Sequence, residues 1–221
     1  SGGGGQDGAG KNQGTGSEHR ITAMKQPLGT LLVVSGPSGS GKTTLCRRAT
    51  ENGLCVYSIS CTTRRPRSGE VDGVDYHFLT AAEFAARVER GDFLEYAEVH
   101  GNRYGTLKAD ILNLLEQGKN VVMDIDVQGA EQIRACVDGI LPKCYTDVYI
   151  YVPQEELRNR LCGRQTDEDE VISLRLRNAA REDACLPRYQ YCLVSSDRET
   201  DYAAFAALLK CQSMRVALMR E

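Results

Sequence analysis

The sequence predicts an α/β protein in which helices cover both faces of a parallel sheet. Three observations support this fold class. Short apolar runs rich in β-branched residues alternate with segments of helical character, as they do in repeated strand–helix units. A glycine-rich loop follows the first apolar run and opens the first helical segment. Residues 60–104 interrupt the alternation with short segments and many turns, which indicates an inserted, strand-rich subdomain.

The first half of the domain predicts one strand and three helices. Residues 30–34 (TLLVV) form a continuous apolar run, which is typical of a strand buried on both faces. The helical segment TTLCRRATEN follows the glycine-rich loop and ends near a glycine. Residues 81–91 place Phe84 and Val88 one helical turn apart and end at Gly91, and residues 108–118 predict a helix that also ends at a glycine.

The second half predicts three more strands and three more helices. The strands are short apolar runs that cover residues 120–126, 146–152 and 191–196. Pro153 closes the second of these runs. The helices cover residues 154–164, 170–183 and 201–220. Because strands and helices alternate here as well, all of these elements are expected to belong to one sheet and its covering layers.

Length and composition limit the possible functions. A chain of 221 residues is long enough for one domain with small inserted subdomains. Its net charge of −3 argues against nucleic-acid binding, which needs a broad basic surface. We find neither a targeting signal nor an apolar run near the roughly 20 residues that span a bilayer, so we expect a cytoplasmic protein that binds no membrane. The nine cysteines and three histidines lack Cys-x-x-Cys pairs and metal-ligand spacing, which argues against disulfides and zinc.

Residues 1–26 predict a disordered tail. Most of this stretch, SGGGGQDGAGKNQGTGSEHR, is polar and rich in glycine. Such a sequence cannot bury enough apolar surface to offset the entropy lost when a chain is ordered. The folded domain is therefore expected to cover residues 27–221.

The segment GPSGSGKT, residues 36–43, matches the G-x-x-x-x-G-K-[ST] pattern of a phosphate-binding loop. It lies between a predicted buried strand and a predicted helix, which is the context that the pattern requires. Glycines let backbone N–H groups point at phosphate oxygens, and the helix N-terminus adds a favourable dipole. Lys42 is expected to reach the β- and γ-phosphates, whereas an ordinary turn with an exposed lysine is the alternative. The expected ATP-binding residues are Gly36, Pro37, Ser38, Gly39, Ser40, Gly41, Lys42, Thr43 and Thr44.

Two acidic residues, Asp124 and Asp126, end the predicted strand 120–126. The carboxyl ends of parallel strands face the crevice in which such sheets bind ligands. An acidic residue there can hold Mg²⁺ directly or through water, although a solvated strand end is the alternative. We expect Thr43 and Asp124 to be the metal ligands, while the sequence leaves the choice between the two aspartates open.

The segment SCTTRRPRSGEVDGVDYHF, residues 60–78, predicts a second anion site. Arg64, Arg65 and Arg67 occupy three of four consecutive positions in an acidic chain, and Tyr76 follows them. Arginine pairs bidentately with phosphate oxygens, and a phenolic hydroxyl adds a further donor. We expect Arg65 to point to solvent and the other side chains to bind a second phosphate group.

The segment FLEYAEVHGNRYGT, residues 93–106, supplies Glu95 and, in a glycine-flanked turn, Tyr104. We expect Glu95 to be a buried carboxylate beside the nucleotide site. Guanine offers two adjacent donors, N1–H and the 2-amino group, which match one carboxylate, whereas adenine offers no such pair. The segment therefore favours a guanine nucleotide as the second ligand.

Together, these motifs and the segment DIDVQGA resemble the guanylate kinase family, from about Gly29 to the C-terminal helix. That family transfers a phosphoryl group from ATP to GMP. The resemblance implies a P-loop fold, ATP and GMP as substrates, and Mg²⁺ as cofactor, while the sequence leaves the acceptance of dGMP open. It also implies a core of residues 27–58, 107–158 and 172–221, a GMP-binding part of residues 59–106 and a lid of residues 159–171.

The resemblance assigns roles to individual residues. Those expected to hold the GMP phosphate are Arg64, Arg67, Tyr76 and Tyr104, with Glu70 orienting the arginines. Those expected to recognise the guanine are Ser60, Glu95, Thr106 and Asp126. The expected catalytic residues are Lys42, Arg64, Arg164 and Arg175, and the role of Arg160 is left open. Phosphoryl transfer needs alignment and positive charge, so we expect direct in-line transfer without a nucleophilic side chain.

A catalytically inactive guanylate-kinase-like module that binds protein ligands is the competing hypothesis. Such modules typically lack an intact phosphate-binding loop. Lys42 and Thr43 are both present in this chain, which favours the enzyme. The sequence identifies neither the adenine contacts nor any protein partner.

Overall fold

Five parallel strands form the central sheet in the order β2-β7-β1-β8-β9. The computed structural model describes residues 2, 26–99, 101–136, 138–162 and 169–220. The strands are β1 (Leu31–Ser35), β2 (Val56–Tyr57), β7 (Val121–Asp124), β8 (Tyr145–Tyr151) and β9 (Tyr191–Val194). The predicted α/β class is confirmed, and the two-residue strand β2 is an addition to the prediction. The predicted tail falls almost entirely outside the described residues.

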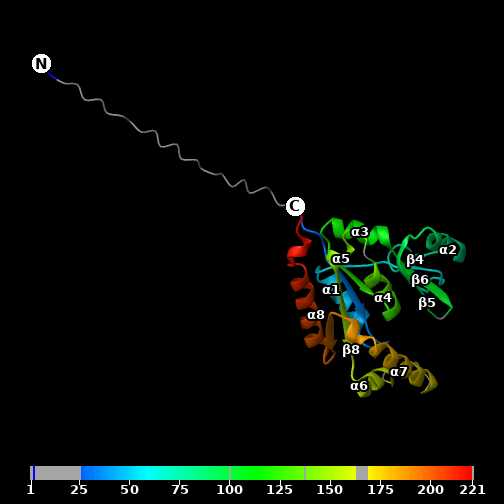
Figure 1. Ribbon diagram of the computed structural model, residues 1–221. Helices are drawn as coiled ribbons and strands as arrows, with labels where there is room; N and C mark the ends of the chain where they lie inside the picture. The colour runs from blue at the N-terminus through cyan, green and yellow to red at the C-terminus, as the bar shows by residue number, and fades with distance from the viewer. Residues whose placement is uncertain (1, 3–25, 100, 137, 163–168, 221) are drawn as a thin grey trace.

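Helices cover both faces of this sheet (Figure 1). One face packs against α1 (Lys42–Glu51) and α8 (Arg198–Gln212). The other packs against α3 (Lys108–Glu116), α4 (Val127–Ala135) and α5 (Leu141–Cys144). Successive side chains of a strand point to opposite faces, so Leu32 and Val34 of β1 join the first layer while Leu31 and Val33 join the second. This two-sided burial explains why the strand sequence TLLVV is apolar throughout.

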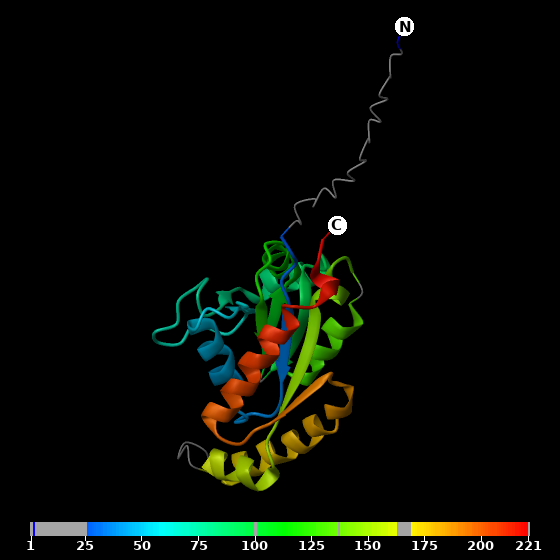
Figure 2. The same ribbon diagram turned by 90° about the vertical axis from the view of Figure 1, so that its left-hand side faces the viewer.

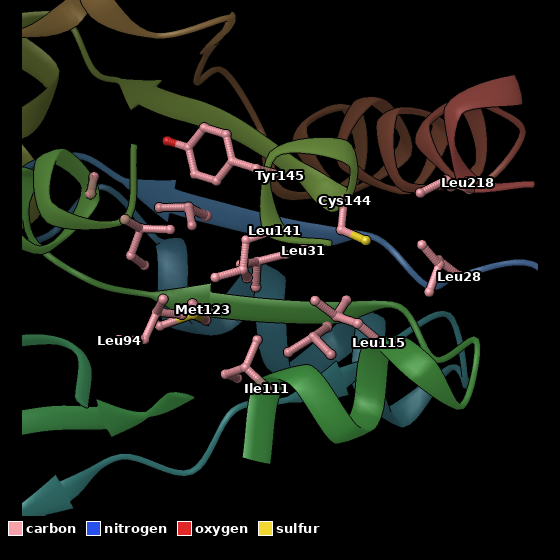
Figure 3. Close-up of a cluster of buried hydrophobic side chains, with 14 residues drawn as sticks. Leu28, Leu31, Leu94, Ile111, Leu115, Met123, Leu141, Cys144, Tyr145 and Leu218 are labelled. Carbon is pink, nitrogen blue, oxygen red and sulfur yellow. The ribbon is translucent and has the colours of Figure 1, made fainter. Parts of the chain in front are cut away.

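Figure 3 shows the second of these layers, with Ile111 and Leu115 of α3 directed at the strand that carries Met123. Leu28 and Leu218 lie together at one end of the cluster. The backbone N–H of Leu28 donates to the carbonyl oxygen of Leu218 over 2.8 Å. The start of the described domain and its C-terminal end therefore lie side by side, as Figures 1 and 2 also show.

A second, four-stranded sheet forms the inserted subdomain, in the order β4-β3-β6-β5. Its strands are β3 (Cys61–Thr62), β4 (His77–Phe78), β5 (Phe93–Val99) and β6 (Asn102–Leu107). Helix α2 (Ala81–Glu89) packs on it through Phe84, whose ring centroid lies 4.5 Å from that of Phe93. Thr80 and Glu83 form a capping box that begins the helix. The predicted strand-rich insertion is confirmed.

Two further helices, α6 (Gln154–Cys162) and α7 (Asp169–Asp183), pack on each other through Leu157, Leu161 and Ile172. They lie at a different side of the molecule from the small sheet (Figure 1). Residues 163–168, in the middle of the predicted lid, lie outside the described residues. Among the helices that the structure describes, none has both the length and the apolar character needed to cross a membrane.

Several predicted boundaries differ from those observed, and two of the differences have a clear structural cause. Helix α8 ends at Gln212 and does not reach residue 220, because the chain then turns through a short 3₁₀ helix, η2 (Val216–Leu218), that buries Leu218 against Leu28. Strand β7 ends at Asp124 and not at Asp126, because the side chain of Asp126 accepts from Gly129 N–H and so caps helix α4. A second 3₁₀ helix, η1 (Leu186–Arg188), precedes β9.

Candidate active site

The phosphate-binding loop connects β1 to α1, at the centre of the sheet. The strand order reverses at β1, between β7 and β8, and ligands of open α/β sheets bind at such a point. Gly36 is held at φ +144°, and a Cβ there would lie 2.5 Å from the carbonyl oxygen of Ile150. Only glycine allows the loop to turn this closely over β8.

Lys42 folds back over this loop. Its Nζ atom donates to the carbonyl oxygens of Gly36 (2.7 Å) and Pro37 (3.1 Å). The ammonium group therefore lies at the mouth of the loop, where the first backbone N–H groups of α1 also point. This arrangement suits an anion of several negative charges.

Thr43 and Asp124 meet beside the lysine. Val34 of β1 pairs with Asp124 of β7, which brings the end of β7 to the loop. Thr43 Oγ1 donates to Asp124 Oδ2 over 2.5 Å, and Tyr57 lies 3.5 Å from the same oxygen. Hydroxyl and carboxylate oxygens are ligands that Mg²⁺ prefers when phosphates and waters complete its shell. The described residues contain no cluster of three or more His, Cys, Asp or Glu side chains for an all-protein metal site.

A cavity of about 400 Å³ lies over these groups. Nine predicted site residues line it, namely Gly36, Ser38, Gly39, Gly41, Lys42, Thr43, Thr44, Asp124 and Asp126. Ile125 and Glu182 also line it, and no motif in the sequence points to either residue. Burial raises the pKa of Glu182 to about 7, while the nearby Lys42 acts in the opposite direction. A third acidic group from α7 thus faces the phosphate site.

A second cavity of about 660 Å³ adjoins the first and shares Gly39, Gly41 and Thr44 with it. Helices α1, α6 and α8 supply most of its other lining residues. The Arg48 guanidinium lies 4.0 Å from the centre of the Tyr202 ring and pairs with both carboxylate oxygens of Glu199. Ser40 lines this cavity, and its buried hydroxyl has no hydrogen-bond partner among the described residues.

Arg160 joins α6 to the loop after β9. It donates to Ser195 Oγ (3.0 Å) and to the carbonyl oxygen of Ser196 (3.2 Å), and it pairs with Glu156. Its guanidinium therefore lines the second cavity instead of the phosphate cavity. In this conformation Arg160 therefore connects α6 to the loop between β9 and α8, and its role in catalysis stays open.

Arg64 and Glu70 form an ion pair in the small sheet subdomain. Arg64 Nη2 donates to Glu70 Oε1 over 2.8 Å, and the backbone N–H of Arg67 donates to the other carboxylate oxygen over 2.7 Å. The hydrogen bond from Arg64 lowers the pKa of Glu70, and the same contact raises the pKa of Arg64. Glu70 therefore connects the two predicted phosphate-binding arginines. The side chains of Arg65 and Arg67 are exposed.

Two tyrosines stand next to this pair. The Arg64 guanidinium lies 5.4 Å from the centre of the Tyr76 ring, which meets the Tyr104 ring edge-on at 6.1 Å. Tyr104 comes from β6 and Tyr76 from the segment before β4. The fold thus brings Arg64 and Tyr104, which are 40 positions apart, to one surface. This surface carries both cationic and phenolic donors.

Glu95 is buried with 5% of its surface exposed, which confirms the prediction of a buried carboxylate. Thr106 Oγ1 donates to Glu95 Oε1 over 2.7 Å, and Ser60 Oγ lies 3.3 Å from the same hydroxyl. Burial raises the pKa of Glu95 to about 7, and the charge of Asp126 acts in the same direction. Three of the four residues predicted at the guanine are therefore one connected group.

Asp126 is the fourth. It caps α4 through a 2.8 Å hydrogen bond from Gly129 N–H, and it lines the phosphate cavity. A Cβ at Gly129 would lie 2.9 Å from Glu95 Oε2 and 3.5 Å from Asp126 Oδ1. Both carboxylates therefore meet at the N-terminus of α4, where the helix dipole favours negative charge. Asp126 links the phosphate cavity with the Glu95 group.

The two remaining predicted catalytic residues belong to the α6–α7 region. Arg175 lies partly buried on α7, outside the lining of the phosphate cavity. Arg164 lies outside the described residues. The predicted closure of these arginines over the transferred group stays a prediction.

Several known proteins are similar to this chain in sequence and in structure. A family model described as guanylate kinase matches residues 28–212. The chain is 47% identical over 180 residues to a guanylate kinase of Nitratidesulfovibrio vulgaris, which covers 80% of this chain and 84% of the relative. It is 40% identical over 200 residues to one of Clostridium perfringens, with 89% and 90% covered. A crystal structure of guanylate kinase from Anaplasma phagocytophilum superposes with a TM-score of 0.70 at 29% identity, covering 89% of this chain and 92% of that one.

Proposed function

The chain belongs to the guanylate kinase family, and we propose that it transfers the γ-phosphoryl group of ATP directly to GMP within the cleft described above. The products are ADP and GDP. One observation carries the proposal: Asp126 lines the phosphate cavity and also adjoins the buried Glu95 group. A triphosphate on the loop and a guanine at Glu95 would therefore be neighbours.

ATP occupies the two adjoining cavities in this proposal. The triphosphate lies over the loop 36–44, where backbone N–H groups and Lys42 bind its oxygens. The adenosine lies in the larger cavity, beside Arg48 and Tyr202. The shared lining residues Gly39, Gly41 and Thr44 support this path, because one extended ligand can pass from one cavity to the other.

Mg²⁺ fits the oxygen donors at the end of β7. Thr43 and Asp124 would hold it, since their oxygens already lie together at the phosphate cavity. When bound with ATP, the ion supplies positive charge that neutralises the phosphate oxygens. Asp126 is not assigned to the metal in this proposal; it caps α4 and lies beside the guanine.

GMP occupies the surface between the two sheets. Arg64, Arg67, Tyr76 and Tyr104 bind its phosphate, and Glu70 orients both arginines through the contacts described above. The Glu95 carboxylate accepts from N1–H and the 2-amino group of guanine, with Ser60, Thr106 and Asp126 around it. Adenine would leave this buried acid without a partner, which costs binding energy and so favours guanine.

The chain's own groups align the two nucleotides and stabilise charge. Lys42 binds the ATP phosphates and Arg64 the GMP phosphate, and Arg164 and Arg175 supply further positive charge upon closure. An in-line attack by a GMP phosphate oxygen requires no nucleophilic side chain and no covalent enzyme intermediate. Closure also excludes water, which would otherwise accept the phosphoryl group.

We infer two further properties. Because the proposed contacts address the base and the phosphate, dGMP is also an acceptor. The nine free cysteines and the use of ATP and GMP support a cytoplasmic location, where thiols stay reduced.

A coupled assay of ADP release tests the proposal. GMP, dGMP, AMP, CMP and UMP are offered as acceptors, each with and without Mg²⁺. We expect Mg²⁺-dependent release with GMP and dGMP, and little with the others. Equal rates with AMP and GMP would overturn the guanine assignment. No turnover with any acceptor, together with retained binding of a peptide ligand, would instead support an inactive binding module.

A further inference from the structure

Strand β5 lies at the edge of the small sheet and pairs with β6 on one side. On its other side, the carboxamide of Gln132 from α4 contacts the backbone of Tyr96 twice. Gln132 Oε1 accepts from Tyr96 N–H over 3.0 Å, and Gln132 Nε2 donates to the carbonyl oxygen of Tyr96 over 2.8 Å. One side chain of the central domain thus forms both hydrogen bonds that a neighbouring strand would form at this residue.

Tyr96 directly follows Glu95, at a point where the strand is irregular. The register with β6 shifts between Phe93 and Glu95, so Leu94 is an extra residue in the strand. Such bulges often turn a side chain toward an active site. Leu94 packs in the core layer between the large sheet and helices α3, α4 and α5, while Phe93 packs against α2. The orientation of Glu95 therefore depends on how the strand is held immediately after the irregularity.

The N-cap residue of α4 and two residues within the helix, spaced three apart, meet this part of β5. Asp126 caps the helix, Gly129 leaves room for the Glu95 carboxylate, and Gln132 binds the next residue of the strand. Residues at this spacing share a helix face. The face joins the subdomain that carries Glu95 to the helix that carries Asp126.

We infer that Gln132 is a positioning residue for guanine recognition: its two hydrogen bonds to Tyr96 fix β5 against α4 and so hold the Glu95 carboxylate beside Asp126. The inference rests on the proposed role of Glu95 in binding guanine. Gln132 itself does not touch the base. It acts on the selection of the acceptor nucleotide and leaves the ATP side unchanged.

The substitution Gln132→Met tests this, since it keeps the length of the side chain and removes both hydrogen bonds. IMP, which lacks the 2-amino group, serves as the probe of guanine recognition. Loss of two exposed hydrogen bonds is expected to raise the KM for GMP about threefold to tenfold and to lower the preference for GMP over IMP by a similar factor. The KM for ATP stays unchanged. Gln132→Glu keeps the acceptor but not the donor, so an intermediate effect is expected.

Gln154→Met, at the exposed start of α6, is the matched control and should behave as the unchanged protein. Equal losses for ATP and GMP, or a lower melting temperature with an unchanged GMP-to-IMP preference, would show a merely structural role and overturn the inference. Calorimetric GMP binding to Gln132→Met supplies the same comparison without turnover. Absence of GMP phosphorylation by the unchanged protein would overturn the proposed function, whereas weaker GMP binding by the variant would still support the inference.

Discussion

Thr106 Oγ1 donates a 2.7 Å hydrogen bond to Glu95 Oε1 in a buried part of the cleft. Burial raises the pKa of Glu95 to about 7, although this hydrogen bond acts in the opposite direction. An acid in this environment changes its charge near neutral pH. Since the guanine N1–H and 2-amino donors favour the ionised form, the charge of Glu95 affects both nucleotide binding and stability.

We predict that kcat/KM for GMP falls as the pH decreases below about 7. Protonation of Glu95 in the free enzyme replaces an acceptor by a donor opposite guanine N1–H, and kcat/KM reports ionisations of the free enzyme. The loss approaches about tenfold per pH unit in the acid limb. Initial rates at limiting GMP and saturating ATP, measured from pH 5 to 9, provide the profile.

The variant Glu95→Gln is the reference for that profile, because the phosphate of GMP itself titrates near pH 6. It should have a lower kcat/KM at pH 8 and should retain only the part of the pH dependence that comes from GMP. An identical profile in both proteins would rule out Glu95 as the titrating group.

The free energy of unfolding should depend on the ionisation of Glu95 as well, but it should fall as the pH rises, whereas kcat/KM for GMP should rise. Its pKa is raised from about 4.5 to about 7 on folding, so between these values the folded state keeps a proton that the unfolded state has released. The free energy of unfolding therefore falls as the pH rises through this window and is constant above it. The free energy of unfolding of Glu95→Gln, measured relative to that of the unchanged protein, should therefore increase by about 3 kcal/mol from pH 4 to pH 8. Urea unfolding at both pH values measures the gain, and a constant difference would contradict it.

Local patterns predicted much of this site. The phosphate-binding loop 36–44 could be predicted because its motif consists of adjacent residues. Seven residues of this loop, together with Asp124 and Asp126, line the phosphate cavity. The segment 93–106 predicts a buried Glu95, and the two adjacent donors of guanine match that carboxylate. Both predictions rest on short stretches of sequence, in which residue type and spacing determine the conformation.

Contacts that depend on distant packing were not predictable in this way. Helix α4 contains Gly129, a weak helix former, because Glu95 from another subdomain occupies the space of a side chain. The end of α8 depends on Leu218 packing against Leu28, almost 200 residues away. No motif marks Glu182 or Gln132, and only the fold brings Glu182 to the phosphate cavity and Gln132 to the edge of β5.

The substitution Gly129→Ala should impair the use of GMP without destabilising the protein. The new Cβ would lie 2.9 Å from Glu95 Oε2, so the carboxylate must move, while alanine itself favours the helix. We expect the KM for GMP to rise about tenfold or more, with the KM for ATP unchanged. Steady-state kinetics and a thermal melt measure the two effects.

The double variant Glu95→Ala/Gly129→Ala provides the control for this clash. Once the carboxylate is gone, the second substitution should have little further effect, so the two changes should be far from additive. Additive losses would show that the Gly129 substitution acts through the helix and not through Glu95.

Removing the charge of Glu70 should weaken GMP binding through the arginines. In Glu70→Gln, the ion pair with Arg64 is lost and the contact with the Arg67 backbone is weakened. We expect the KM for GMP to rise about tenfold at neutral pH while the KM for ATP is unchanged, because the Arg64 guanidinium loses its charged partner and the backbone that carries Arg67 is held less firmly. Asp92→Asn, which removes an exposed ion pair with Arg90 in the same subdomain, is the matched control. An unchanged KM for GMP in Glu70→Gln would contradict the orienting role.

Replacing Lys42 should separate binding from catalysis. The Lys42 ammonium donates to the carbonyl oxygens of Gly36 and Pro37, and in the reaction it would exchange these neutral acceptors for phosphate oxygens as negative charge shifts toward the leaving group. Lys42→Ala should therefore lower kcat by about 10²–10³, as expected when a preorganised donor is lost from a transition state. GMP affinity, measured by calorimetry, should stay unchanged, since the guanine and phosphate contacts come from the small sheet and α4. Lys210→Ala, at the exposed end of α8, controls for loss of a positive charge. A normal kcat in Lys42→Ala would mean that this loop does not hold the transferred phosphoryl group, because a donor at that position could not be removed without slowing the transfer.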